Sequence, residues 1–232
     1  MESDLDRFLA RFAAFGAAPS RERYLALFHP EATLFDSGMP RPIRVPEIPE
    51  HIEGILRLVP DFRMMPERAR AHGATLFVEA SNRATLGGVD LRWPSVYCMD
   101  LAGDRVIRGR RYYDRWPLFA ALNPDLPALP DAAVRREGDP LAAADADSER
   151  PAWARRLEIC VSRLELAPLA RAGDDALRFI VWRVRGRVAG ETVTFGVAER
   201  QDLRARHAQA CFDTLALATR LGAADAQDGR AA

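Results

Sequence analysis

The chain has 232 residues, 48% of them hydrophobic, which is enough to bury the core of one large domain or of two small ones. Its 33 basic residues balance its 33 acidic residues, so no long-range electrostatic field attracts nucleic acid or an anionic membrane. Every basic residue is arginine, which excludes a lysine Schiff base and a lysine general base and is typical of a GC-rich bacterial genome.

Residues 1–60 carry helical patterns with one short strand among them. Residues 5–15 place their apolar side chains on one helical face, and Gly16 ends that pattern. A second helix follows Ser20, a candidate N-cap, and stops before Pro30. We expect a strand over residues 32–36 and a third helix over residues 49–59. The expected buried helix positions are Phe8, Phe12, Tyr24, Leu27, Phe28 and Ile55.

From residue 62 onward the pattern changes to strands. Four strands are expected, over residues 62–70, 76–86, 90–101 and 105–113, with hairpin signals at residues 87–88 and 102–104. Helices followed by such strands predict an α+β fold, in which N-terminal helices pack on a curved antiparallel sheet. A linker rich in Pro, Ala and Asp is expected over residues 123–151.

Residues 175–203 repeat the strand and turn pattern of residues 74–101. Gly190 corresponds to Gly88, and Asp213 corresponds to Asp114, which favours a helix-capping role for both aspartates. We interpret residues 152–222 as a truncated, mostly β second copy of the sheet, and residues 223–232 as a disordered tail. The uncovered face of this sheet is expected to pack on the first sheet as an internal pseudo-dimer, with a homodimer or a chance similarity as the alternatives.

Cysteine spacing and motifs speak against a metal or a cofactor. Cys98, Cys160 and Cys211 form no C-x-x-C pair, so neither a disulfide framework nor a zinc site follows from them. No phosphate-binding loop, nucleophile elbow or paired-histidine motif occurs. The acidic N-terminus leads directly into an amphipathic pattern, and no apolar run is long enough to cross a bilayer. We expect a cytoplasmic protein with no membrane contact and no cofactor.

Five segments, in their order and spacing, resemble bacterial SnoaL-like proteins of the nuclear-transport-factor-2-like superfamily: residues 8–12, 29–36, 87–88, 93–96 and 111–114. The resemblance covers residues 1–122 and implies a cone-shaped domain that encloses a small apolar molecule. Ketosteroid isomerases, polyketide cyclases, epoxide hydrolases, dehydratases and binding modules all belong to this group. The fold therefore does not fix the function.

The resemblance places Asp36 at the position of the proton-shuttling aspartate of the ketosteroid isomerases. Phe12 stands where those enzymes have the tyrosine that holds the enolate oxygen. Alignment through the turn at residues 102–104 places Tyr97 at the position of the second oxyanion donor, whereas alignment through Trp93 places Val96 there. We prefer Tyr97, because a phenol on the same strand face as Trp93 can donate a hydrogen bond to an oxyanion.

Other polar residues are candidates for contact with a substrate. Asn82 is the polar group on an apolar strand face; if the opposite face lined the cone, Glu79 and Arg83 would form a buried pair there. An arginine cluster at residues 105–115 is expected to form ion pairs, with Arg111 and Tyr113 at the mouth of the cone. The candidate substrate-binding residues are Phe12, Asn82, Trp93, Arg111 and Tyr113.

These residues predict a cofactor-independent isomerase or cyclase that acts on an apolar polyketide-like or terpenoid molecule. Asp36 would be the base and Tyr97 the donor, and a lyase or epoxide hydrolase is less favoured. Bacterial polyketide biosynthesis or other secondary metabolism is the setting that the resemblance implies. The alternative is a non-catalytic ligand-binding or interaction module, in which Asp36 is an exposed turn residue that caps its own backbone. A small apolar molecule is the expected partner, and nucleic acid is not.

Overall fold

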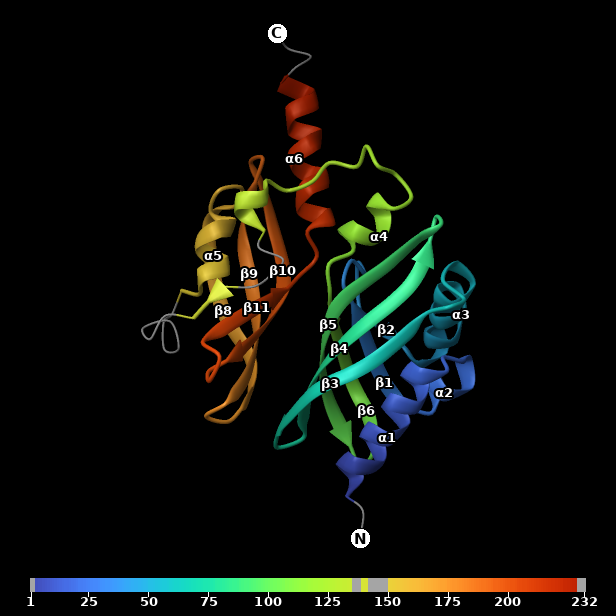
Figure 1. The fold of residues 1–232 in the computed structure, drawn as a ribbon. Coiled ribbons are helices and arrows are strands. Elements are labelled where there is room, and N and C mark those ends of the chain that lie inside the picture. The colour runs from blue at the N-terminus through green and yellow to red at the C-terminus, as the bar shows by residue number, and fades with distance from the viewer. Residues whose placement is uncertain (1–2, 135–138, 142–149, 229–232) are drawn as a thin grey trace. The chain divides into compact units, whose positions relative to one another are not determined.

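The computed structural model describes residues 3–134, 139–141 and 150–228 (Figure 1). The chain divides into two compact units, Met1–Tyr113 and Asp114–Ala232, and each has its own sheet. Parts of the expected linker and tail, residues 135–138, 142–149 and 229–232, lie outside the described residues. Within the described residues, no helix combines the length and apolar character needed to span a bilayer.

In the first unit, the helices cover one face of the sheet (Figure 1). Ser3 and Asp6 form a capping box at the start of α1, and the side chain of Ser20 caps α2 by accepting from the backbone N–H of Arg23. The helices are α1 (Asp4–Ala17), α2 (Arg21–Leu25) and α3 (Ile48–Leu58), with the 3-10 helix η1 (Val45–Glu47) before α3.

Gly16 lies inside α1 rather than beyond its end, because the helix continues to Ala17. A Cβ atom at Gly16 would lie 2.1 Å from the backbone oxygen of Met64, on strand β3 (Arg63–His72). The glycine therefore allows close packing of α1 on β3 and does not terminate the helix.

The sheet of the first unit has six strands in the order β2-β1-β6-β5-β4-β3. β3, β4, β5 and β6 form an antiparallel meander, whereas β1 pairs antiparallel with β2 and parallel with β6. The predicted α+β fold is confirmed, but the sheet is mixed rather than wholly antiparallel. The remaining strands are β1 (Phe28–Asp36), β2 (Ile43–Arg44), β4 (Thr75–Leu86), β5 (Val89–Ala102) and β6 (Arg105–Tyr112).

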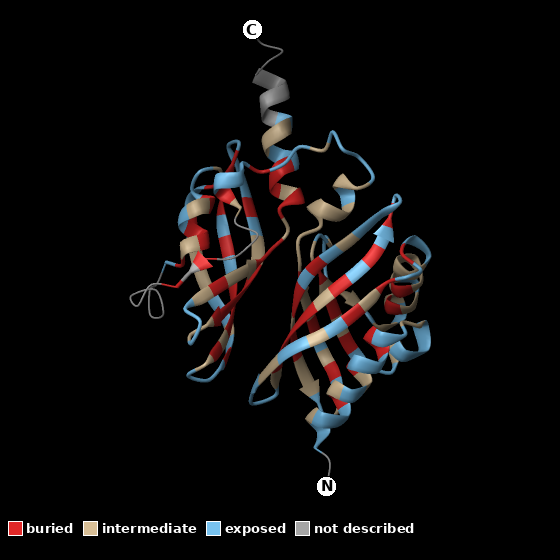
Figure 2. Ribbon diagram, in the orientation of Figure 1, coloured by how far each residue is buried: buried red, intermediate tan, exposed pale blue. Residues whose placement is uncertain are grey.

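Burial along β4 tells the two faces of this sheet apart (Figure 2). Asn82, Ala84 and Leu86 are buried, whereas Arg83 and Thr85 are exposed. Because successive side chains of a strand point to opposite faces, the apolar face that carries Asn82 lines the interior.

The second unit is mostly β, as predicted, and its five-stranded sheet has the order β7-β11-β10-β9-β8. The expected linker contains the 3-10 helix η2 (Asp131–Ala133) and strand β7, and α6 extends into the expected tail. The strands are β7 (Asp139–Pro140), β8 (Ser162–Gly173), β9 (Leu177–Val188), β10 (Glu191–Asp202) and β11 (His207–Cys211). The helices are α4 (Trp116–Ala120), α5 (Ala152–Leu157) and α6 (Leu215–Asp228).

The β9–β10 hairpin pairs in the same register as the β4–β5 hairpin. Val78 lies opposite Tyr97 in the first, and Ile180 lies opposite Glu199 in the second, so each counterpart carries a number 102 higher. The same offset relates β3 to β8 as far as Pro66 and Pro168, after which both strands have a register shift. The first three strands of the meander thus pair in the same register in both units. In the described part of the second unit, two α-helices, α4 and α5, precede them.

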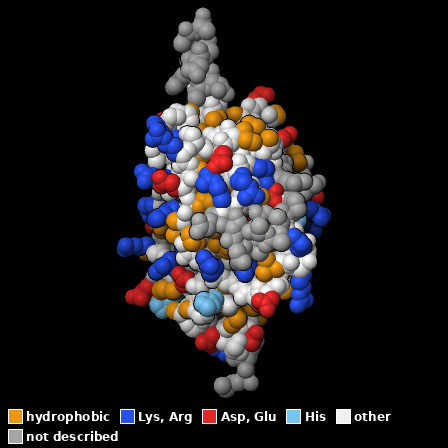
Figure 3. Space-filling model, turned by 90° about the vertical axis from the view of Figure 1, so that its left-hand side faces the viewer, with side chains coloured by type: hydrophobic (Ala, Val, Ile, Leu, Met, Phe, Trp, Pro, Cys, Tyr) orange, Lys and Arg blue, Asp and Glu red, His pale blue; other side chains and the backbone are white. Residues whose placement is uncertain are grey.

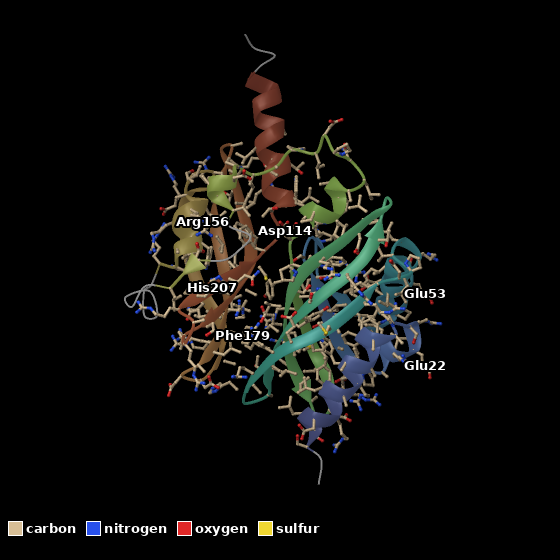
Figure 4. The ribbon with its side chains drawn as sticks, in the orientation of Figure 1. Glu22, Glu53, Asp114, Arg156, Phe179 and His207 are labelled. Carbon is tan, nitrogen blue, oxygen red and sulfur yellow. The ribbon has the colours of Figure 1, made fainter. Side chains whose placement is uncertain are left out.

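Asp114 and Asp213 hold chain segments together within the second unit. Asp114, labelled in Figure 4, accepts hydrogen bonds from the backbone N–H groups of Trp116 and Thr214, each at 3.0 Å. Asp213 accepts from Nη2 of Arg115 at 2.8 Å. Burial raises the pKa of Asp114, although these hydrogen bonds act in the opposite direction. Both aspartates therefore have structural partners.

Candidate functional site

Asp36 lies at the end of β1, and its carboxylate is buried, with 5% of the residue exposed. The parallel pairing of β1 and β6 places it in register with Arg111. Ser37 fixes this arrangement, because its hydroxyl donates to the backbone oxygen of Arg111 at 3.3 Å and accepts from the N–H of Tyr113 at 3.2 Å. Asp36 does accept a hydrogen bond from the next backbone N–H, at 3.1 Å, but it is not the exposed turn residue of the alternative prediction.

Two basic side chains face the carboxylate of Asp36. Nη1 of Arg111 and Nε2 of His51 each lie 3.8 Å from Oδ2 of Asp36. Glu22 of α2 and Glu53 of α3 lie on the outer side of the helices, away from the sheet (Figure 4). The negative charge beside Arg111 therefore comes from Asp36.

Arg111 is the centre of the polar network in the interior, not a residue of the cone mouth as predicted, since its side chain is 11% exposed. Its Nη2 donates to Oδ1 of Asn82 at 3.1 Å, and its Nε donates to Oγ of Ser95 at 3.3 Å. Asn82 in turn donates to Ser95 at 2.8 Å and to the backbone oxygen of Trp93 at 3.0 Å. A buried guanidinium needs such partners, because an unpaired charge in an apolar interior is strongly destabilising.

Aromatic rings surround the guanidinium of Arg111. Its Cζ atom lies 4.4 Å from the ring centroid of Tyr113, 5.3 Å from that of Tyr97 and 5.9 Å from that of Phe62. These distances are in the range of cation–π attraction. Phe12 packs edge-on against Tyr97, with the ring centroids 5.0 Å apart, so it contributes an apolar wall beside this phenol.

Two phenols in the interior keep their protons. Burial raises the pKa of Tyr97 to about 12, even though the positive charge of Arg111 acts to lower it. Burial also raises the pKa of Tyr24, and the negative charge of Asp36 adds to that effect. Both phenols are therefore hydrogen-bond donors at neutral pH.

Two buried nitrogen atoms of the interior have no hydrogen-bond partner among the described residues: Nε2 of His51 and Nε1 of Trp93. Leaving such a group unsatisfied is costly, so both are candidates for contact with a bound molecule. His51 is not among the site residues expected from the sequence. It lies three residues after Ile48 and one before Ile52, on the buried face of α3, and this helical spacing is the signal that identifies it.

Glu79 and Arg83 do not form the buried pair considered above. Glu79 lies on the opposite face of β4 from Asn82 and pairs with Arg68, at 2.8 Å. Arg83 is exposed.

Two cavities adjoin the polar network. A small one of about 30 Å³ is lined by Phe12, Tyr24 and Tyr97, among other aromatic and aliphatic residues. A larger one of about 620 Å³ opens beside the end of α1, and its lining includes Asn82 and Met64. Only the larger cavity has the size typical of small-molecule sites. Asn82 connects the larger cavity to the polar network, because it lines that cavity and accepts a hydrogen bond from Arg111.

The predicted site residues thus belong to one network. Asp36, Asn82, Tyr97 and Tyr113 each contact or face Arg111 directly. Trp93 joins through its backbone oxygen, and Phe12 joins through the ring of Tyr97.

No profile of a known protein family matches the chain, and no curated protein sequence does. Solved structures are similar to it. A hypothetical protein with a ketosteroid isomerase-like fold from Catenulispora acidiphila, in complex with trimethylamine, is 16% identical, with a TM-score of 0.42 over 46% of this chain and 84% of that one. A SnoaL-like polyketide cyclase candidate from Jannaschia sp. CCS1 is 15% identical, with a TM-score of 0.45 over 51% and 90%. An epoxide hydrolase of the LEH-like kind from M. tuberculosis is 17% identical, with a TM-score of 0.44 over 53% and 97%.

Proposed function

We propose that the protein catalyses an acid/base isomerisation or cyclisation of a small, mostly apolar molecule that carries an enolisable carbonyl group. The observation that supports this proposal best is the placement of a buried carboxylate, Asp36, and a protonated phenol, Tyr97, on the same guanidinium, Arg111. A base and two donors of this kind are what enolate chemistry requires.

In the proposed reaction, the carboxylate of Asp36 removes a proton from the carbon next to the carbonyl group. The electron pair of that C–H bond moves onto the carbonyl oxygen, and the resulting enolate oxygen accepts hydrogen bonds from Arg111 and Tyr97. In an isomerisation, Asp36 returns the proton to a different carbon. In a cyclisation, the enolate carbon attacks a second carbonyl carbon of the same molecule, and Asp36 supplies its proton to the new alkoxide.

The balance of donors and acceptors indicates the class of substrate. The interior presents the donors Tyr24, Tyr97 and Arg111 and the unpartnered Nε1 of Trp93, against one carboxylate, Asp36. A ligand that satisfies these groups must itself be rich in acceptors. A polyketide-like molecule with several carbonyl oxygens meets this condition better than a terpenoid hydrocarbon does.

A second candidate function is a ligand-binding module without catalysis. The small cavity beside Tyr97, about 30 Å³, supports it, because that volume holds about one water molecule. In this alternative, the ligand occupies the larger cavity beside Asn82, and Asp36 neutralises Arg111.

Hydrogen–deuterium exchange of an apolar aryl ketone distinguishes the two candidates without knowledge of the natural substrate. α-Tetralone is incubated with the protein in D₂O, and loss of the NMR signal of its α-hydrogens is followed. We expect exchange above the buffer rate for the wild type and none above that rate for Asp36→Asn. Glu79→Gln is the matched control, because Glu79 is also buried but lies on the other face of the sheet. Tetralone binding by the wild type without exchange would favour the binding module.

A further inference from the structure

Three arginines lie directly opposite one another on neighbouring strands of the first sheet. Arg63 of β3 is in register with Arg83 of β4, and Arg83 is in register with Arg92 of β5. Strand alternation puts Arg83 on the face opposite to Asn82, outside the interior network. Like charges at directly opposed positions destabilise a sheet. This arginine row (Arg63, Arg83 and Arg92) therefore needs a compensating interaction.

The described part of the chain supplies little compensation. Arg83 and Arg92 have no ion pair or hydrogen bond there, and Arg63 donates to the backbone oxygen of Phe62 at 2.7 Å. The acidic neighbour is Asp61, which interacts electrostatically with Arg63. Its carboxylate already accepts hydrogen bonds from the backbone N–H of Thr85, at 3.0 Å. The carboxylate of Asp61 is thus shared between Thr85 and Arg63.

The second sheet shows that this row is not a requirement of the fold. At the same register positions, each numbered 102 higher, Glu165 lies opposite Arg185, and Arg185 lies opposite Thr194. There the central arginine has an acidic residue on one side and a neutral one on the other. Acidic side chains also lie among the basic ones on the face drawn in Figure 3. The row of three like charges is particular to the first sheet.

The arginine row lines a hollow of the right size for a ligand. All three arginines border the cavity of about 620 Å³, together with Ser81, Ala13 and Met64. A concave surface with charges of one sign concentrates counter-ions more strongly than a flat one. Guanidinium groups are planar donors that match phosphate oxygens in pairs, and three of them balance the two to three negative charges of a phosphate or diphosphate group.

We propose that the arginine row is a second binding site, which holds the phosphate or diphosphate group of a small molecule. Ser81 adds a hydroxyl donor, and Ala13 and Met64 give an apolar surface for the organic part of the ligand. The three arginines are on the opposite face of the sheet from Asp36 and Arg111, although the cavity that they border also reaches Asn82 of the interior network. Phosphate binding by these arginines does not depend on the acid/base activity.

Titration of the full chain with pyrophosphate by calorimetry at low ionic strength tests this proposal. We expect saturable binding at millimolar concentration that Arg83→Gln weakens by about tenfold or more, since charge-assisted hydrogen bonds are lost. Arg185→Gln is the matched control, because it removes the counterpart arginine of the second sheet and should leave binding unchanged. Both arginines lie on solvent-facing positions of their strands, so both variants should fold.

A second variant, Arg63→Glu, places an acidic residue opposite Arg83, as Glu165 lies opposite Arg185 in the second sheet. We expect it to weaken pyrophosphate binding and, without pyrophosphate, to raise the melting temperature, because a like-charge pair becomes an opposite-charge pair. Absence of pyrophosphate binding, an equal loss in Arg185→Gln, or equal affinity for sulfate would overturn the phosphate assignment.

Discussion

Glu199 occupies in the second sheet the register position that Tyr97 occupies in the first. It is 1% exposed, and it accepts hydrogen bonds from Nε1 of Trp182 at 2.8 Å and from Nε2 of Gln201 at 3.1 Å. The residue opposite it on β11 is Ala210, where the first sheet has Arg111 opposite Tyr97. Glu199 is therefore a buried carboxyl group that has no guanidinium at the register position where Tyr97 has Arg111.

The first prediction concerns the pH dependence that Glu199 creates. Burial raises its pKa in the folded protein, so the folded state holds the proton to higher pH than the unfolded state does. Its contribution to stability is fully present below the ordinary carboxyl pKa and is lost as the pH rises through the raised value. We expect Glu199→Gln to be more stable than the wild type at neutral pH, by about 1.4 kcal/mol for each unit of the pKa shift.

Urea unfolding between pH 4 and pH 8, followed by tryptophan fluorescence, measures this difference. The advantage of Glu199→Gln should shrink toward acid pH, where the wild-type carboxyl is protonated in both states. Glu165→Gln, at an exposed position of the same sheet, should show no such trend. A stability difference that is constant across this pH range would contradict a raised pKa for Glu199.

The second prediction concerns the pairing of Arg111 with Asp36. Arg111→Met leaves the buried carboxylate without its main counter-charge, and breaking a buried ion pair in this way costs about 3 to 5 kcal/mol. Asp36→Asn in the Arg111→Met background should recover much of that loss, because no unpaired charge is left. The free energies of unfolding of the wild type, Arg111→Met, Asp36→Asn and the double variant form a double-mutant cycle. If the effects of the two substitutions on the free energy of unfolding were additive, Arg111 and Asp36 would have no interaction energy despite their separation of 3.8 Å.

The third prediction concerns the contact between α1 and β3. Gly16→Ala brings a Cβ atom within 2.1 Å of the backbone oxygen of Met64, so the helix must move. We expect a loss of about 1 to 3 kcal/mol in the free energy of unfolding, as for other overpacked sites. Gly54→Ala is the control, since Gly54 lies in α3 with nothing within 4 Å of the added atom. That change should stabilise slightly, by about 0.5 to 1 kcal/mol.

Local patterns predicted most elements of the first unit, because helical and strand periodicities are visible in short windows. The helix expected over residues 5–15 is α1 (Asp4–Ala17), and the strand expected over residues 76–86 is β4 (Thr75–Leu86). The parallel pairing of β1 with β6 could not be predicted in the same way, because it joins residues far apart in the chain.

In the candidate site, too, local patterns predicted some positions, whereas positions that depend on long-range strand pairing were not predicted. Strand alternation put Trp93 and Tyr97 on one strand face but left open whether the face of Asn82 lines the interior, and in the structure Asn82 and Trp93 are both buried. The central position of Arg111 depends on the register between β1 and β6, which no local pattern encodes, so the residue was expected at the cone mouth. His51 was missed because the carboxylate that it faces at 3.8 Å, that of Asp36, lies on a different element.

The last prediction separates chemistry from binding at Tyr97. If its phenol donates to the enolate oxygen, Tyr97→Phe removes a hydrogen bond that strengthens as negative charge develops, and such a loss typically costs about a hundred- to thousand-fold in rate. We expect slower exchange of the α-hydrogens of α-tetralone with little change in its dissociation constant, because the ring is retained. The side-chain volume changes little, so the free energy of unfolding should stay nearly the same.

Tyr112→Phe is the control for this prediction. Tyr112 is also buried, and burial also raises its pKa, but it lies one residue after Arg111 and therefore on the opposite face of β6. Its substitution should leave the exchange rate unchanged. Because the raised pKa of Tyr97, about 12, keeps the phenol protonated, the rate difference between wild type and Tyr97→Phe should persist from pH 7 to pH 10. Equal exchange rates for the wild type and Tyr97→Phe would leave Arg111 as the donor and remove Tyr97 from the proposed mechanism.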